Sequence, residues 1–360
     1  PYVYDADENR YIDTSVGFGL HMFGHVHPVV TRAIQARVPK GWMFGIHSTS
    51  QLKLANLVQA GSPCAERVVF CNTGSEATMY AFRAARGYSG KDKIALFDGF
   101  YHGAHDYGMW MADPTSPRTE PSAVPMGHGI PGVLKELTLL LPYRDSRAFE
   151  LIRQNKDELA LVFVEGVQSS NPQSEAGEFL RELESVCRSA GVLFGVDEVI
   201  TGFRLAYGGA QERFSLQPDL ATYGKVIGGG LPVGAITGRA EVMAVFTGLA
   251  AERGVFSGGT FSGNPLTMEA GAAVLNHLRD HPEIYVELER RTQRLADVIN
   301  AHCEDLQLPV HMKHVGSMFH LFFQRETIAS SRDIHARGLA AQKAFYLHCL
   351  NAGVLVPGTQ

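Results

Sequence analysis

Short apolar segments alternate with amphipathic helical patterns through the middle of the chain, and this alternation restricts the fold more than any other sequence feature. It is typical of βαβ units, in which mostly parallel strands form one central α/β sheet with helices on both faces. Strands are predicted at residues 67–72, 93–99, 159–166, 192–198, 219–225 and 234–238. Segment 177–191 places its apolar side chains on one helical face and ends at Gly191, so we predict a crossover helix there.

The alternating pattern stops at residues 104–132, which are rich in proline, glycine and serine. They are predicted to form a long loop, and loops of this length in compact domains are usually functional. From about residue 271 a long charged helix and an alternating segment indicate a smaller α+β domain. We expect an N-terminal segment of that domain (1–40), a large ligand-binding domain (41–270) and a C-terminal small domain (271–360). Both ends of the chain interrupt hairpin-like segments, so we expect an incomplete small domain, as in a piece of a larger multidomain chain.

Composition excludes several classes of protein. The chain has 360 residues, 45% of them hydrophobic, and can bury a large core. Its 32 Lys and Arg against 37 Asp and Glu indicate no basic face for nucleic acid. The longest apolar runs are shorter than the roughly 20 residues of a membrane helix, so no membrane span is expected. The five cysteines form no C-x-x-C pair, which argues against a disulfide framework or zinc ribbon and favours a cytoplasmic location.

Polar residues that follow predicted strands are the first candidates for a site, because ligands of open α/β sheets bind beyond the carboxyl ends of the strands. Thr73, Gly74 and Ser75 follow the strand 67–72 and open a helix. Backbone N–H groups at such a helix N-terminus bind anions, phosphate above all. An ordinary helix cap with Glu76 in the first turn is the alternative, and on this segment alone it is the more frequent case.

Asp197 lies near the end of the apolar strand 192–198 and is a second candidate. A buried carboxylate needs a cationic or hydrogen-bonding partner. Either a ligand with a protonated nitrogen or a structural ion pair with Arg204 would meet this need, and the sequence pattern leaves both open.

Lys225 ends the strand 219–225 and precedes three glycines, 228–230. A P-loop needs glycines before its lysine and a hydroxyl residue after it, whereas Val226 stands there. The dinucleotide spacing G-x-G-x-x-G also fails, because Gly234 comes one residue too late. A lysine at a buried strand end is a desolvated amine of lowered pKa, which is the condition for a Schiff-base nucleophile.

A pyridoxal 5'-phosphate enzyme needs a lysine for the aldehyde, an acid for the pyridinium nitrogen and a cradle for the phosphate. Lys225, Asp197 and segment 73–75 supply these three groups. Tyr101 and His102 follow the strand 93–99, and the tyrosine adds an aromatic ring for stacking. A core tyrosine is the alternative interpretation of Tyr101.

These motifs resemble the class III pyridoxal phosphate-dependent aminotransferases, and within them the glutamate-1-semialdehyde aminomutase subgroup. The most specific similarity lies in segments 197–235 and 258–271, and it extends over nearly the whole chain. The resemblance implies a fold type I transferase, with a mostly parallel sheet and a smaller α+β domain. It further implies that Lys225 forms the internal aldimine and shuttles protons, and that Asp197 pairs with the pyridine nitrogen. Val199 and Tyr101 would cover the two ring faces.

The resemblance also implies the remaining cofactor contacts. Gly74 and Ser75 would hold the phosphate, and Thr260 of a neighbouring subunit would complete that cradle, so the active unit would be a homodimer with shared sites. Gln168 matches the position near the phenolic oxygen of the cofactor, and Glu165 opens the same motif.

The implied activity is transfer of an amino group between an amino donor and an aldehyde or ketone acceptor. Gly166 and Ser170 depart from the E-P-x-Q-G-E run of many ω-aminotransferases, which favours the aminomutase subgroup. Segment 111–132, however, is similar to aminotransferase modules of polyketide and nonribosomal peptide synthases and indicates secondary metabolism. A glutamate-1-semialdehyde 2,1-aminomutase, a non-catalytic module that retains the fold and a nicotinamide-dependent dehydrogenase are the alternatives, the last weakened by its glycine spacing.

His21 and His25 have the i, i+4 spacing of a zinc-binding helix. Gly24 and Pro28 oppose a helix there, and no acidic residue accompanies the pair as in H-E-x-x-H. We therefore predict no metal site.

Overall fold

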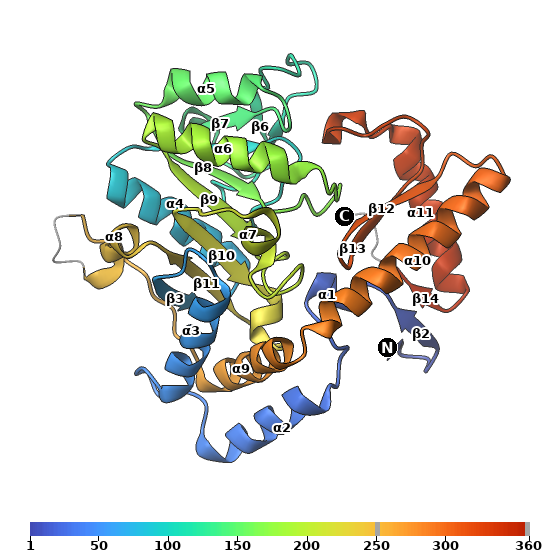
Figure 1. Ribbon diagram of the computed structural model, residues 1–360, viewed down its shortest axis with the longest axis horizontal. Helices are drawn as coiled ribbons and strands as arrows, with labels where there is room; N and C mark the ends of the chain where they lie inside the picture. The colour runs from blue at the N-terminus through green and yellow to red at the C-terminus, as the bar shows by residue number, and fades with distance from the viewer. Residues whose placement is uncertain (249–252, 357–360) are drawn as a thin grey trace.

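The computed structural model describes residues 1–248 and 253–356, and Figure 1 shows a large sheet-centred body beside a C-terminal unit. The N-terminal strands lie beside the C-terminal unit, because β14 (Val354–Leu355) pairs in parallel with β2 (Arg10–Asp13), which in turn pairs with β1 (Tyr2–Tyr4). The domain boundaries at residues 41 and 271 stay a prediction. Among the described residues, no helix is long and apolar enough to cross a membrane.

Seven strands form the central sheet in the order β3-β11-β10-β9-β8-β4-β7. Neighbouring strands are parallel except for β11, which is antiparallel to β10 and β3. The predicted α/β sheet is confirmed, but the sequence pattern misses β7, a four-residue edge strand directly after a 3₁₀ turn. The strands are β3 (Arg67–Cys71), β4 (Lys93–Phe97), β7 (Thr138–Leu141), β8 (Leu159–Glu165), β9 (Leu193–Glu198), β10 (Leu220–Gly224) and β11 (Gly234–Gly238).

Helices cover both faces of this sheet because its central strands are apolar on both sides. All seven residues of β8 are buried. One core cluster joins the sheet to α5 and α6, and a second joins it to α4. Helix α6 ends at Gly191 in the left-handed conformation, as its sequence predicts. The helices of this body are α3 (Thr49–Gly61), α4 (Gly74–Ser89), α5 (Arg147–Asn155), α6 (Ala176–Ala190), α7 (Gly209–Phe214), α8 (Ala240–Met243) and α9 (Pro265–Asp280).

The loop predicted at 104–132 contains regular structure, which corrects that prediction. Strands β5 (Trp110–Ala112) and β6 (Ala123–Pro125) pair antiparallel inside it. Buried Trp110 anchors the pair, and its indole N–H donates to the carbonyl oxygen of Asp106 at 2.9 Å. Strands of three residues are too short to produce a period in the sequence.

The C-terminal unit combines a long helix with an antiparallel hairpin, as the alternating segment predicts. Its elements are α10 (Glu283–Asp305), β12 (His311–Val315), β13 (Met318–Phe322), the 3₁₀ helix η5 (Ser331–Asp333) and α11 (Ala336–Asn351). The remaining short elements are α1 (Val16–Gly19), α2 (Pro28–Arg37), η1 (Val38–Lys40), η2 (Gly132–Leu137), η3 (Lys225–Gly228) and η4 (Ala244–Thr247).

Gly271 lets α9 lie directly on η3, the turn that begins at Lys225. A Cβ atom at this position would overlap the carbonyl oxygen of Ile227. Alanine in a helix is normally about 0.5–1 kcal/mol more favourable than glycine. The clash with rigid backbone opposes this gain and is the larger effect, since overpacking a core costs about 1–3 kcal/mol.

We therefore expect Gly271→Ala to lower the free energy of unfolding by about 1–3 kcal/mol in denaturant titration. Gly132→Ala is the matched control, because nothing lies within 4 Å of a Cβ atom there. A Gly271→Ala protein as stable as the wild type would contradict the proposed contact.

Candidate active site

A cavity of about 430 Å³ opens at the carboxyl ends of β4, β8, β9 and β10. The structure brings all the predicted site residues together in its wall except Gln168 and Thr260. Those in the wall are Thr73, Gly74, Ser75, Tyr101, His102, Glu165, Asp197, Val199 and Lys225.

The start of α4 is a helix cap, and its first N–H groups have the geometry to bind an anion. The Thr73 hydroxyl accepts from the N–H of Glu76 at 3.0 Å, and the Glu76 carboxylate accepts from the N–H of Thr73 at 3.1 Å. This reciprocal capping box confirms the cap that the sequence suggests. The N–H groups of Gly74 and Ser75 precede the first intrahelical bond, from Ala77 to Thr73, so they and the helix dipole remain suited to a phosphate.

Gly74 brings this helix start close to the cavity wall formed by Val199. A Cβ atom on residue 74 would lie 2.8 Å from a methyl group of Val199, which is closer than such atoms pack. Glycine is therefore required here for close approach, and it places the anion-binding N–H groups beside Val199.

Three donors orient the buried Asp197 carboxylate. Its Oδ1 accepts from the N–H of Val199 at 3.0 Å and from the Thr222 hydroxyl at 3.1 Å. The Nδ1 atom of His102 lies 2.8 Å from Oδ2. The side chains of both His102 and Asp197 are almost fully buried. The carboxylate is thus held in one orientation at the wall of the cavity.

The interpretation of Asp197 as the partner of Arg204 in a structural ion pair is wrong. Arg204 instead donates to the carbonyl oxygen of Gly19 and, at 3.1 Å, to the hydroxyl of Ser317. Because the chain turns sharply after β9, Arg204 reaches the N-terminal segment and the C-terminal unit rather than the cavity. Burial lowers the pKa of Arg204 to about 10.

Lys225 has a backbone φ of 46°, in the left-handed region that non-glycine residues rarely adopt. Such strain is typical of functional sites. Desolvation by burial lowers the pKa of the Lys225 amine, and the nearby Asp197 and Glu165 carboxylates oppose this shift. The strand end therefore presents an amine that loses its proton more readily than an exposed lysine.

Glu165, at the end of β8, joins two segments of the cavity wall. Its carboxylate accepts from the N–H of Tyr101 at 3.1 Å and from the N–H of Ser169 at 2.9 Å. Burial raises the pKa of Glu165. The Tyr101 side chain is 53% exposed, so it is not the core tyrosine of the alternative interpretation and its ring can cover a bound planar group.

Gln168 and Thr260 lie outside the cavity wall. The Gln168 amide donates to the carbonyl oxygen of Gly99 at 2.8 Å, and its Oε1 is buried with no partner among the described residues. Thr260 is exposed.

Several residues of the site escape prediction from the sequence. Thr222 contacts Asp197 because β9 and β10 pair in parallel with these two residues in register. In the sequence, Thr222 is marked only by its place on the strand that leads to Lys225. Gly17 and Leu20 reach the cavity from the N-terminal segment, and no local pattern marks them.

The aminotransferase class-III family profile matches residues 1–359. The chain is a class III aminotransferase. It is 37% identical to the glutamate-1-semialdehyde 2,1-aminomutase of Methanocaldococcus jannaschii, over 100% of this chain and 83% of that protein. The structure is similar to an omega-transaminase from Sphaerobacter thermophilus, with a TM-score of 0.91 and 31% identity over 99% of this chain and 82% of the other. It is also similar to a transaminase with pyridoxal phosphate bound, with a TM-score of 0.87 and 29% identity over 99% and 81%.

The site of this class III aminotransferase fits the family's cofactor, pyridoxal phosphate. Gly74 leaves space and N–H donors where an anion can approach, and the oriented Asp197 carboxylate can accept from a protonated ring nitrogen. Lys225 and Tyr101 line the same cavity. The protein is a pyridoxal phosphate-dependent aminotransferase or aminomutase.

The histidines singled out in the sequence form no zinc-binding helix in this aminotransferase. His21 and His25 follow α1 outside regular structure, and His25 lies 2.7 Å from the carboxylate of Asp13. Across residues 1–248 and 253–356, no group of three or more His, Cys, Asp or Glu could hold a metal ion.

The lowered pKa of Lys225 predicts how cofactor capture depends on pH. Only the uncharged amine attacks an aldehyde, so the capture rate by cofactor-free protein should rise with pH and reach half its maximum below 10.5, the ordinary lysine value. Asp197→Asn removes an anion that favours the charged amine, and it should move this midpoint to lower pH. Stopped-flow absorbance of added pyridoxal phosphate measures the rate.

Nα-acetyl-lysine is the exposed-amine control for this measurement. A protein midpoint equal to that of the control would contradict the inferred burial of Lys225. A midpoint that Asp197→Asn raises would contradict the inferred electrostatic contact.

Proposed function

We propose that this enzyme transfers an amino group from a small amine donor to an aldehyde or ketone acceptor, with Lys225 and Asp197 as its catalytic residues. One observation carries the proposal: the strained, desolvated Lys225 lines the same cavity as the oriented Asp197 carboxylate and the anion-binding start of α4. When bound, pyridoxal phosphate supplies an aldehyde for the amino group and a ring that accepts electrons from the substrate carbon.

The chain's own residues would divide the remaining tasks. Lys225 would hold the cofactor through its amine and, when that amine is free, would move a proton to and from the substrate carbon. Asp197 would accept a hydrogen bond from the ring nitrogen and keep it protonated. Val199 and Tyr101 would cover the two ring faces, and the N–H groups of Gly74 and Ser75 would hold the phosphate.

Three further predicted residues belong to this proposal. His102 orients Asp197 through Nδ1, and Glu165 orients the backbone of Tyr101. Gln168 would donate to the phenolic oxygen with the second N–H of its amide, since the first is bound to the carbonyl oxygen of Gly99.

A homodimer with shared sites is the second part of the proposal. Thr260 would contribute to the phosphate cradle of the partner subunit. Its position supports this, because Thr260 is exposed between Phe256 and Phe261, which are 61% and 62% exposed. Exposed aromatic and aliphatic side chains also gather at Trp42, Phe44 and Ile46, and apolar surface of this kind is typical of interfaces.

A glutamate-1-semialdehyde 2,1-aminomutase is the second candidate. It is favoured by the 37% identity to the M. jannaschii enzyme of that name over the whole chain. Ser170 supports it as well, because a serine stands where the ω-aminotransferase motif has its second glutamate. A role in secondary metabolism, suggested by segment 111–132, belongs to the first candidate, intermolecular transfer.

A donor and acceptor screen tests the proposal. Loaded protein should convert a suitable amine donor to its carbonyl product in an amount equal to the bound cofactor, and it should turn over only when a carbonyl acceptor is added. Lys225→Ala should lower the rate by at least about a thousandfold, since it removes both the nucleophile and the proton carrier. Arg290→Ala, at an exposed ion pair of α10, is the control for folding.

Two results would decide against intermolecular transfer. Formation of 5-aminolevulinate from glutamate-1-semialdehyde without an added donor would establish the aminomutase. Wild-type protein that takes up no pyridoxal phosphate would contradict both candidates.

A further inference from the structure

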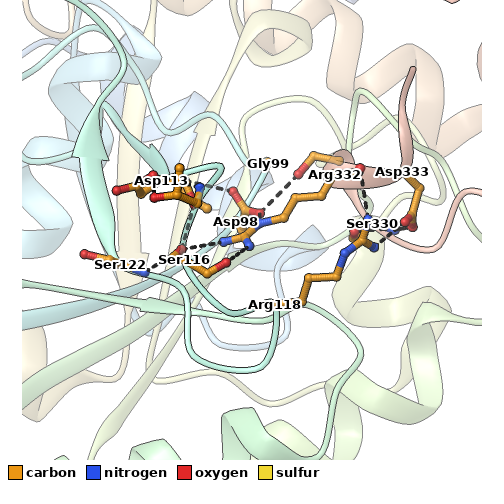
Figure 2. Close-up of polar contacts among 12 residues, drawn as sticks. Asp98, Gly99, Asp113, Ser116, Arg118, Ser122, Ser330, Arg332 and Asp333 are labelled. Carbon is orange, nitrogen blue, oxygen red and sulfur yellow. Dashed lines mark hydrogen bonds and ion pairs between the residues drawn. The ribbon is translucent and has the colours of Figure 1, made fainter. Parts of the chain in front are cut away.

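The C-terminal unit docks on the large body through two reciprocal ion pairs, shown in Figure 2. Arg332 of η5 pairs with Asp98, which directly follows β4, and Asp333 of η5 pairs with Arg118 of segment 104–132. Each side thus contributes one cation and one anion. We call Asp98, Ser116, Arg118, Arg332 and Asp333 the latch.

Arg332 uses its whole guanidinium group in this contact. Its Nε lies 3.0 Å from Asp98 Oδ2, while its two terminal nitrogens donate to the carbonyl oxygen of Ser116 at 2.9 Å and to the Ser116 hydroxyl at 3.2 Å. The side chains of Arg332 and Asp98 are 14% and 10% exposed. Because the pair is shielded from water and has a fixed geometry, removing one partner should cost more stability than removing one partner of a surface ion pair. A lysine would supply the charge without the planar fork.

The second ion pair, between Arg118 and Asp333, is more exposed to water and therefore weaker, but it joins segment 104–132 to η5. Arg118 is 63% exposed, and it contacts the carboxylate of Asp333 and the carbonyl oxygen of Arg332. Asp333 also accepts from the N–H groups of Ser330 and Ala329, at 2.8 and 3.0 Å, and so holds the turn of η5 in shape. The segment 104–132 is therefore bound to a preformed turn of the C-terminal unit.

The latch lies directly against the segment that builds the cavity wall. Gly99 has φ of 83°, and a Cβ atom there would lie 2.5 Å from Cβ of Ser331, so η5 packs on its backbone. Gly99 also accepts from the Gln168 amide at 2.8 Å. Tyr101 and His102 follow within three residues and line the cavity.

Asp98 connects the C-terminal unit to segment 104–132 as well as to the cavity wall. Its Oδ1 accepts from the N–H of Ala112 in β5 at 3.0 Å, while Oδ2 contacts Arg332. One carboxylate thus ties together the end of β4, the short strand pair of segment 104–132 and the C-terminal unit.

We propose that Arg332 is a positioning residue for the amino transfer: by docking the C-terminal unit on Asp98 and Ser116, it sets the backbone that places Tyr101 over the cofactor ring and holds segment 104–132 beside the cavity. The role for Tyr101 rests on the proposed function, whereas the hold on segment 104–132 does not. The site is complete only while the latch is closed.

The test compares Arg332→Met and Arg332→Lys with Arg290→Met, a matched change at an exposed ion pair of the same unit. The first measurement is hydrogen exchange in cofactor-free protein. Residues 113–122 of Arg332→Met should exchange at least about tenfold faster than in the wild type, since charge-assisted contacts to Asp98 and Ser116 are lost. Peptides of β8 should keep their wild-type rates. Arg332→Lys should fall between the two, because it keeps the charge and loses the fork.

The second measurement is visible circular dichroism of bound pyridoxal phosphate, which reports the asymmetric surroundings of the ring and therefore the placement of Tyr101. Arg332→Met should lose at least about half of this signal at unchanged absorbance. The KM for the amine donor should rise more than kcat falls, because the chemical groups themselves remain. Arg290→Met should behave as the wild type in all measurements.

The outcomes separate a failure of the latch from a failure of the proposed function. Exchange in residues 113–122 and circular dichroism that match Arg290→Met would overturn the proposal. If Arg332→Met raises exchange in β8 and is therefore unfolded, Arg332→Lys decides by the same two criteria. If the wild type binds no cofactor, the proposed function fails, while the exchange measurement still decides whether the latch holds segment 104–132.

Discussion

The buried Asp197 carboxylate is the constraint on which the rest of the site depends. A carboxylate with almost no exposure at the end of a central strand persists only where donors surround it. Those donors come from its own turn (Val199), from the neighbouring strand (Thr222) and from the segment after β4 (His102). The parallel register of β9 with β10 places Thr222 beside Asp197, so the orientation of the carboxylate depends on the topology of the sheet. Any ligand with a protonated ring nitrogen meets an acceptor that is already oriented.

Lys225 and the start of α4 complete the site because the same edge of the sheet collects the ends of several strands. Lys225 adopts a strained left-handed backbone conformation at its position. Gly229 and Gly230 follow it with φ of 60° and 98° and let the chain turn away from the cavity. Burial lowers the pKa of the amine, while the Asp197 and Glu165 carboxylates limit that shift. A lowered pKa agrees with the role proposed for this amine as nucleophile and proton carrier.

The latch extends this organisation beyond the sheet. Glu165 accepts from the N–H of Tyr101 in the cavity wall, and Ser331 of the C-terminal unit packs on Gly99, two residues before it. Glu165 and Ser331, which are far apart in the chain, thereby contact one segment of backbone. Arg204 does the same at the N-terminal side, since it joins Gly19 and Ser317. The candidate site of this class III aminotransferase is therefore built by the large body, while the N-terminal segment and the C-terminal unit contact the segments around it.

The sequence by itself determined the α/β sheet and most of the chemical groups of the site. Strand periods, the helix stop at Gly191 and the capping residues Thr73 and Glu76 are local signals, and each operates within a few residues. Only the tertiary structure decided which partners those groups meet: Thr222 and His102 rather than Arg204 for Asp197, β5 and β6 inside a segment without a period, and Arg332 on Asp98. These contacts join residues distant in the chain, and their energies depend on burial and on the register between strands, neither of which leaves a period in the sequence.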